Sequence, residues 1–308
     1  MSLPRPPRFT GLVAAPFTPF HADGSLNLAV IPCYARFLKQ RGVRAAFVCG
    51  TTGEGASLST EERERIAEAW IQADVLPVIV HTGHTSLPEA RRLAAHAEKH
   101  GAAAFAALAP FFFKPRTPGE LADWCAALAS AAPALPFYYY HIPSMTGVSM
   151  PVIDVLKAAG DRIPNLAGVK YTHEDLADFS ACLRHADGKF DLLFGRDEML
   201  LEGAETGSLG AVGSTYNYAS PLYVRLLAAL AAGDRAQARA LQDQSIAMIA
   251  DCNAAGVTHL AASKALMPWL GIDCGPVRLP LAQPVPAQLA TLRKKLTTLG
   301  FFEPGFAG

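Results

Sequence analysis

Short, almost wholly apolar runs alternate along the chain with longer segments in which apolar residues recur every three or four positions. The short runs are typical of parallel strands that are covered on both faces, and the longer segments predict amphipathic helices. The predicted strands are residues 11–16, 44–50, 75–80, 102–108, 137–140, 167–171, 190–194 and 209–212. The helices that follow them are predicted at residues 28–41, 61–73, 87–100, 118–131, 151–159, 174–185, 198–205 and 221–232.

Eight strand–helix units at steady spacing predict an α/β fold of the (β/α)8, or TIM barrel, type. No Gly-x-Gly-x-x-Gly follows the first strand, which disfavours an open dinucleotide-binding sheet. Residues 9–232 are predicted to form the barrel and to carry the active site. Residues 233–308 are predicted to form a C-terminal helical extension packed on the barrel, with helices near 236–252, 258–270 and 286–299.

Composition narrows the class of protein. Lys and Arg together number 27, as do Asp and Glu, so the chain lacks the basic excess of a general nucleic-acid-binding protein. Its six cysteines are scattered without a C-x-x-C pair, which indicates reduced thiols and a cytoplasmic protein. No apolar run approaches the roughly 20 residues of a membrane span. The proline-rich start lacks the apolar core of a signal peptide.

Lys170 lies near the end of the sixth predicted strand, after the apolar residues Leu166, Ala167 and Val169. These neighbours predict that the lysine is buried, and burial disfavours its charged form and lowers its pKa. A neutral amine beside a carbonyl compound can form a Schiff base. The alternative is a surface lysine at a strand end, with its ammonium group in water.

Other polar residues follow strands whose carboxyl ends meet at the same rim of a barrel. Thr51 and Thr52 stand between glycines after the second strand, where their hydroxyls and backbone N–H groups could bind an anion such as a carboxylate. A plain glycine turn explains them as well. Tyr140, at the end of the fifth strand, could relay a proton, although packing alone is the simpler explanation for a strand tyrosine.

Later strand ends add further polar candidates. Thr172 shares a strand face with Lys170. Asp197 and Glu198 follow the seventh strand, where they could accept hydrogen bonds from sugar hydroxyls or simply favour a helix start. His81 and His84 lack a third ligand in the sequence, so we predict no metal site there.

Three ordered motifs resemble those of the pyruvate-dependent class I aldolases, the family of dihydrodipicolinate synthase and N-acetylneuraminate lyase. They are Gly50-Thr51-Thr52-Gly53-Glu54, Tyr140-x-x-Pro143 and Gly168-Val169-Lys170. The resemblance implies that Lys170 forms a Schiff base with pyruvate or a 2-keto acid, that Tyr140 moves protons, and that Thr51 and Thr52 hold the substrate carboxylate. It also implies a homotetramer, and a reaction that needs no metal or organic cofactor because the lysine is the electron sink.

Within the family, the rim resembles the sialic acid lyases more than the synthases. Met145 stands where the synthase pattern has an arginine, and residues 110–115 offer only phenylalanines where that pattern has a tyrosine. The resemblance to the lyases implies that Thr172 lies beside the Schiff base and that sugar hydroxyls are bound by Gly195, Asp197, Glu198 and Ser214. The expected reaction is retro-aldol cleavage of N-acetylneuraminate to N-acetylmannosamine and pyruvate. The alternatives are a dihydrodipicolinate synthase, an aldolase for another 2-keto-3-deoxy sugar acid, and a catalytically silent barrel that binds keto acids.

Overall fold

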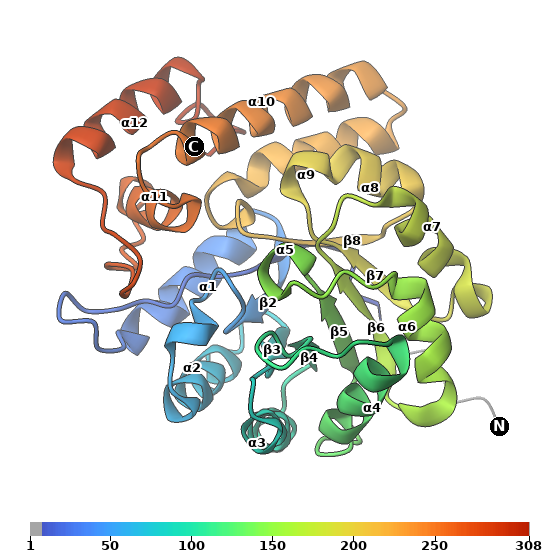
Figure 1. Ribbon diagram of the computed structural model, residues 1–308. Helices are drawn as coiled ribbons and strands as arrows, with labels where there is room; N and C mark the ends of the chain where they lie inside the picture. The colour runs from blue at the N-terminus through green and yellow to red at the C-terminus, as the bar shows by residue number, and fades with distance from the viewer. Residues whose placement is uncertain (1–7, 308) are drawn as a thin grey trace.

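The computed structural model describes residues 8–307, so most of the proline-rich start lies outside the described residues. Eight parallel strands pair in sequence order, and β1 pairs with β8 to close the barrel (Figure 1). This confirms the predicted TIM barrel. The strands are β1 Gly11–Ala14, β2 Val43–Val48, β3 Val78–His81, β4 Ala104–Leu108, β5 Phe137–His141, β6 Leu166–Tyr171, β7 Asp191–Phe194 and β8 Gly210–Gly213.

Helices surround the barrel and continue beyond it. The α-helices are α1 Ile31–Gln40, α2 Thr60–Gln72, α3 Leu87–Lys99, α4 Pro118–Ala129, α5 Pro143–Thr146, α6 Val152–Ala159, α7 Leu176–Arg184, α8 Leu200–Thr206, α9 Tyr216–Ala231, α10 Arg235–Asn253, α11 His259–Leu266 and α12 Pro286–Thr298. Short 3-10 turns are η1 Leu28–Val30, η2 Gly55–Ser57, η3 Gly160–Arg162, η4 His185–Gly188, η5 Asp197–Met199 and η6 Met267–Leu270. The capping box between Ser59 and Glu62 fixes the start of α2.

Strand side chains alternate between the barrel interior and the surrounding helices. On β5, Tyr138 and Tyr140 belong to the interior cluster with Phe47 of β2, whereas Tyr139 packs in the outer cluster under the helices. This alternation follows from the two-residue period of a strand. The same alternation decides which strand residues can reach the barrel interior, because a residue two positions from an inward-facing one faces inward as well.

The helix after β8 differs from the prediction. It begins at Tyr216 rather than at Pro221, so Pro221 lies inside α9. A proline within a helix lacks the N–H donor and its ring crowds the preceding turn. Here Ala219 leaves helical geometry, with φ −124° and ψ 20°, and this bend accommodates the ring. The predicted helix at 198–205 also starts later, at Leu200, because residues 197–199 form the turn η5.

The C-terminal helices lie against one side of the barrel, with α10 packed along α9 (Figure 1). The buried amide of Gln242 on α10 donates to the carbonyl oxygen of Asp197 at 3.0 Å and accepts from the Leu201 backbone at 2.9 Å. The C-terminal part of the chain therefore supports the rim after β7, although the division of the chain at residue 232 stays a prediction. Within residues 8–307, no helix combines the length and apolar character needed to cross a membrane.

Candidate active site

Lys170 lies in the barrel interior near the carboxyl end of β6, and its side chain is buried. Its Nζ lies 4.0 Å from the ring centroid of Phe47 and 4.0 Å from that of Tyr140. Burial lowers the pKa of Lys170 to about 7, and the nearby Asp197 carboxylate offsets part of the shift. The predicted burial is confirmed, and the amine is available in its neutral form near neutral pH.

Tyr140 is the strand partner of Lys170, since the two residues are directly paired between β5 and β6. Its phenol oxygen lies 3.4 Å from the Oγ1 of Thr51, the first threonine after β2. Burial raises the pKa of Tyr140 to about 12, and the neighbouring hydroxyls of Thr51 and Thr172 oppose that rise. The phenol is therefore protonated at rest. Three elements distant in sequence thus bring an amine, a phenol and a hydroxyl together.

Asp197, in the turn η5 after β7, is buried at the same rim. Its Oδ2 accepts hydrogen bonds from the Thr215 backbone N–H at 2.9 Å and from the Thr215 hydroxyl at 2.7 Å. Its Oδ1 is buried and has no partner among residues 8–307. Burial raises the pKa of Asp197 to about 6, although the Thr215 hydrogen bonds and Lys170 oppose the rise. A buried carboxylate oxygen without a donor is a ready acceptor for a ligand hydroxyl.

Two glycines make room for these polar groups. A Cβ on Gly195 would lie 2.1 Å from the Oγ1 of Thr172, and a Cβ on Gly213 would lie 2.1 Å from the Oδ1 of Asp197. Both contacts are far inside van der Waals range, so any larger residue at either position must displace the neighbouring oxygen. The Thr172 hydroxyl is also buried, and it lies near enough to the Tyr140 phenol to oppose the rise in the pKa of that tyrosine.

The remaining candidates lie at the same rim with greater exposure. Thr52 is half-buried beside the exposed Thr51, and Ser214 is half-buried directly after β8. Glu198 is paired with Arg196, whose Nη2 lies 2.8 Å from its Oε1. The roles of Thr52, Ser214 and Glu198 in substrate binding stay predictions.

Comparison with known proteins identifies the family of the chain. The model of the dihydrodipicolinate synthetase family matches residues 8–299. The chain belongs to this family. It is 41% identical over 305 residues to the N-acetylneuraminate lyase of Rattus norvegicus, covering 97% of this chain and 95% of the relative.

Solved structures agree with this family. The N-acetylneuraminate lyase of Proteus mirabilis superposes with a TM-score of 0.92 at 42% identity, covering 96% of this chain and 100% of that one. A dihydrodipicolinate synthase from Cyanidioschyzon merolae superposes with a TM-score of 0.87 at 26% identity, covering 95% of this chain and 98% of that one. Both branches of the family therefore share the fold, and the lyase is the more similar of these two in sequence.

A cavity of about 400 Å³ opens at the ends of β2 to β4, beside the rim that carries Lys170 and Tyr140. Thr51 lines it, and so do Phe111 and Met145. These last two residues belong to the segments in which the sequence departs from the synthase pattern. The structure therefore places Met145 and one phenylalanine of the 110–115 segment in the same cavity.

Sequence reasoning missed several residues that shape this site. Phe47 resembles any apolar strand residue, yet the Lys170 amine lies 4.0 Å from its ring centroid. The signal for it is the two-residue period of β2, which turns Ala45 and Phe47 toward the barrel interior. His81, considered only as a metal ligand, is instead a buried neighbour of Tyr140, with ring centroids 5.8 Å apart. Its Nδ1 lies 3.1 Å from the Cys49 carbonyl oxygen, and burial lowers its pKa well below the usual value.

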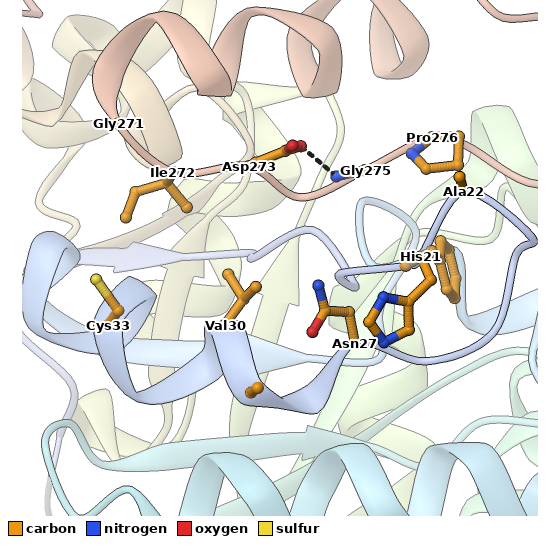
Figure 2. A pocket seen from close by; sticks show the side chains of 12 residues that line it. His21, Ala22, Asn27, Val30, Cys33, Gly271, Ile272, Asp273, Gly275 and Pro276 are labelled. Carbon is orange, nitrogen blue, oxygen red and sulfur yellow. Dashed lines mark hydrogen bonds between the residues drawn. The ribbon is translucent and has the colours of Figure 1, made fainter.

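A second cavity, of about 610 Å³, lies outside this rim, between residues 20–33 and 271–276 (Figure 2). It contains none of the residues that the sequence analysis assigned to the site. Figure 2 shows the Asp273 carboxylate at its edge bonded to the Gly275 backbone N–H, at 2.8 Å. The acidic group of this cavity is thus already used in a turn, and the chemistry of the fold is concentrated at the strand ends.

Proposed function

We propose that this protein is a class I aldolase that cleaves N-acetylneuraminate to N-acetylmannosamine and pyruvate. The observation that carries the proposal is the buried Lys170 amine, held between two aromatic rings with its pKa lowered to about 7. At pH 7 about half of such amines are neutral, whereas an ordinary lysine is almost wholly protonated. A relative 41% identical over nearly its whole length is named for the same activity.

The reaction begins when the Lys170 nitrogen attacks the C2 ketone of the open-chain sugar acid. Loss of water leaves a protonated imine, which withdraws electrons from the neighbouring C3–C4 bond. Removal of the C4 hydroxyl proton then breaks that bond. The aldehyde product is N-acetylmannosamine, and the bonding electrons form an enamine on the lysine. Protonation of the enamine carbon and hydrolysis of the imine release pyruvate and restore the amine.

Tyr140 is the proposed proton carrier in the cleavage step. Because burial keeps its phenol protonated, Tyr140 can accept the C4 proton only as it passes its own to another acceptor. The Thr51 hydroxyl lies 3.4 Å away, and with Thr52 it is proposed to hold the substrate carboxylate. That carboxylate is the proposed acceptor. Tyr140 therefore relays a proton from the C4 hydroxyl to the carboxylate of the substrate itself.

The other end of the substrate is proposed to bind at the rim after β7 and β8. The Asp197 Oδ1 is a buried acceptor without a donor, which fits a sugar hydroxyl. Glu198, Ser214 and the Gly195 backbone are proposed to bind further hydroxyls, with Thr172 beside the imine. Met145 lines the adjacent cavity and stands where the synthase pattern has an arginine. Residues 110–115 offer no tyrosine for the relay that a synthase completes with a residue of a neighbouring subunit, so both departures disfavour the synthase reaction.

Borohydride reduction in the presence of pyruvate tests the mechanism. A pyruvyl adduct on the peptide that contains Lys170 is expected, and its absence would refute the Schiff base. Pyruvate release from N-acetylneuraminate and from other 2-keto-3-deoxy sugar acids, measured beside condensation of pyruvate with aspartate semialdehyde, tests the substrate. Turnover of aspartate semialdehyde alone would assign the chain to the synthases, and adduct formation without any turnover would indicate a silent keto-acid-binding barrel. The Lys170→Ala variant provides the background rate.

We also propose a homotetramer in the cytoplasm. Phe112 and Phe113 are 74% and 86% exposed and contact each other edge to face, which favours burial against another copy of the chain. Light scattering should give a tetramer that dissociates in the Phe112→Ser/Phe113→Ser variant. All six cysteines are free and five are buried, in keeping with a reducing compartment, and cell fractionation tests this.

A further inference from the structure

A histidine–glutamate cluster lies on the outside of the barrel, between α2 and α3. His96 and His100 are four residues apart on α3 and its C-cap, and the His100 N–H donates to the His96 carbonyl oxygen at 3.1 Å. Their rings stack with centroids 4.2 Å apart and an interplanar angle of 22°. Both rings therefore face the same side of the helix.

Both histidines direct Nε2 toward the same carboxylate oxygen of α2. The Oε1 of Glu68 lies 2.8 Å from the Nε2 of His96 and 3.6 Å from the Nε2 of His100. The three side chains are partly buried, with exposed fractions of 34% for Glu68, 14% for His96 and 28% for His100. Two imidazole nitrogens and one carboxylate oxygen thus converge on one point that solvent can reach.

The packing of the two helices holds these groups in place. One turn before His96, the guanidinium group of Arg92 donates to both oxygens of Glu64, each at 2.9 Å, and to Glu61 at 3.0 Å. A two-point contact of this kind fixes direction as well as distance. It sets the register of α2 against α3, so that the next turn of each helix places Glu68 opposite the two histidines.

We propose that Glu68, His96 and His100 bind a divalent transition-metal ion of the zinc class. The ligand atoms all lie within 4.8 Å of one another. In a tetrahedral site with bonds of about 2.0–2.2 Å, neighbouring ligand atoms are about 3.3 Å apart. On metal binding, the distance from the Glu68 Oε1 to the His96 Nε2 would therefore increase by about half an ångström. The distance from the same oxygen to the His100 Nε2 would decrease slightly. Binding one ion also requires the two Nε2 atoms, at most 4.8 Å apart, to reach this spacing, so the imidazole rings as well as the carboxylate would rotate.

Three protein ligands leave the fourth position of a tetrahedral ion to water. The site is separate from the proposed aldolase reaction. His100 directly precedes the segment that enters β4, at the amino end of the strands, whereas Lys170 lies near the carboxyl end of β6. The bound ion links two outer helices and acts on stability, because a ligand that binds only the folded chain raises its unfolding temperature.

Zinc titration of the chelator-treated full chain at about pH 7.5 tests the site. Calorimetry should detect one high-affinity ion per chain, and zinc should raise the unfolding temperature. His96→Gln, His100→Gln and Glu68→Gln should each raise the Kd at least about tenfold and abolish the thermal shift. His21→Gln is the matched control, since His21 is exposed and outside the cluster, and it should bind like the unsubstituted chain.

The proposal is overturned if zinc binds no tighter than about 1 mM, or if the cluster variants keep a Kd within about twofold of the unsubstituted chain. Circular dichroism and pyruvate release establish that each variant is folded. Both should be unchanged by the three cluster substitutions, because none of these residues lies at the catalytic rim. A thermal shift that survives in the cluster variants but disappears in His21→Gln would place the ion elsewhere and refute the site.

Discussion

Replacement of Lys264 by methionine is expected to destabilise the fold by about 3–5 kcal/mol. On α11, Lys264 donates from Nζ to the Oε1 of Glu54 at 2.7 Å, and each side chain is only 1% exposed. Without the ammonium group, the Glu54 carboxylate keeps one donor among residues 8–307, the Arg278 backbone N–H at 2.8 Å from Oε2. A buried charge without its counter-ion accounts for the expected loss.

The expected loss of stability in Lys264→Met does not come from packing, because methionine has nearly the length and volume of the lysine stem. The substitution also removes the ammonium group that lies 4.2 Å from the Phe20 ring centroid, a contact worth about 2 kcal/mol when desolvated. Burial lowers the pKa of Lys264, and Glu54 opposes the shift, so both charges are costly to bury alone. The double variant Glu54→Gln/Lys264→Met removes both charges. It should therefore lie within about 2 kcal/mol of the unsubstituted chain.

Urea unfolding followed by circular dichroism measures these free energies, and pyruvate release measures function. Glu54 is held in the left-handed region at φ 57°, directly after the Thr51–Thr52–Gly53 turn. Loss of Lys264 should therefore loosen the proposed carboxylate site and raise KM. The reasoning is refuted if Lys264→Met costs less than about 1 kcal/mol, or if the double variant loses the sum of both single losses.

Three further predictions concern the rim. The kcat/KM for cleavage should rise with pH, because only the neutral amine of Lys170 attacks the substrate. The midpoint should lie near the Lys170 pKa, which is about 7. A flat pH profile in pyruvate-release assays would contradict this. Tyr140→Phe should lower kcat by about 10²–10⁴ while borohydride still traps pyruvate on Lys170, and an unchanged kcat would exclude the relay. Gly195→Ala should cost about 1–3 kcal/mol in urea unfolding, because its Cβ would lie 2.1 Å from the Thr172 Oγ1. The control Gly119→Ala, whose Cβ would meet only a contact of 3.8 Å, should cost nothing.

The fold was predictable because its signal is local. Each buried strand is a short apolar run, and each helix repeats every three to four residues, so the order of elements follows from the chain alone. The meeting of Lys170 and Tyr140 was predictable for the same reason. Adjacent parallel strands share a rim, and the two-residue period places Tyr138 and Tyr140 on the inner face.

Other features depend on contacts that no local pattern encodes. Glu54 and Lys264 are 210 residues apart, and nothing in the sequence pairs Glu54, in the turn after β2, with a lysine on α11. The start of α9 was missed because Pro221 is an ordinary signal for a helix start, whereas the bend at Ala219 depends on packing. The steric role of Gly195 likewise becomes visible only when Thr172, from the neighbouring strand end, is in place.

The opposite pKa shifts of Lys170 and Asp197 have one cause, the burial of both groups in the barrel mouth. In the free enzyme, burial favours the neutral amine and the protonated acid, and each charged group partly relieves the other. Imine formation changes this balance, because the protonated imine carries a positive charge until the C3–C4 bond breaks. That charge lowers the pKa of Asp197 and keeps its carboxylate ionised during cleavage. Its free Oδ1 can then only accept a hydrogen bond, so Asp197 is proposed to orient a substrate hydroxyl rather than to supply a proton.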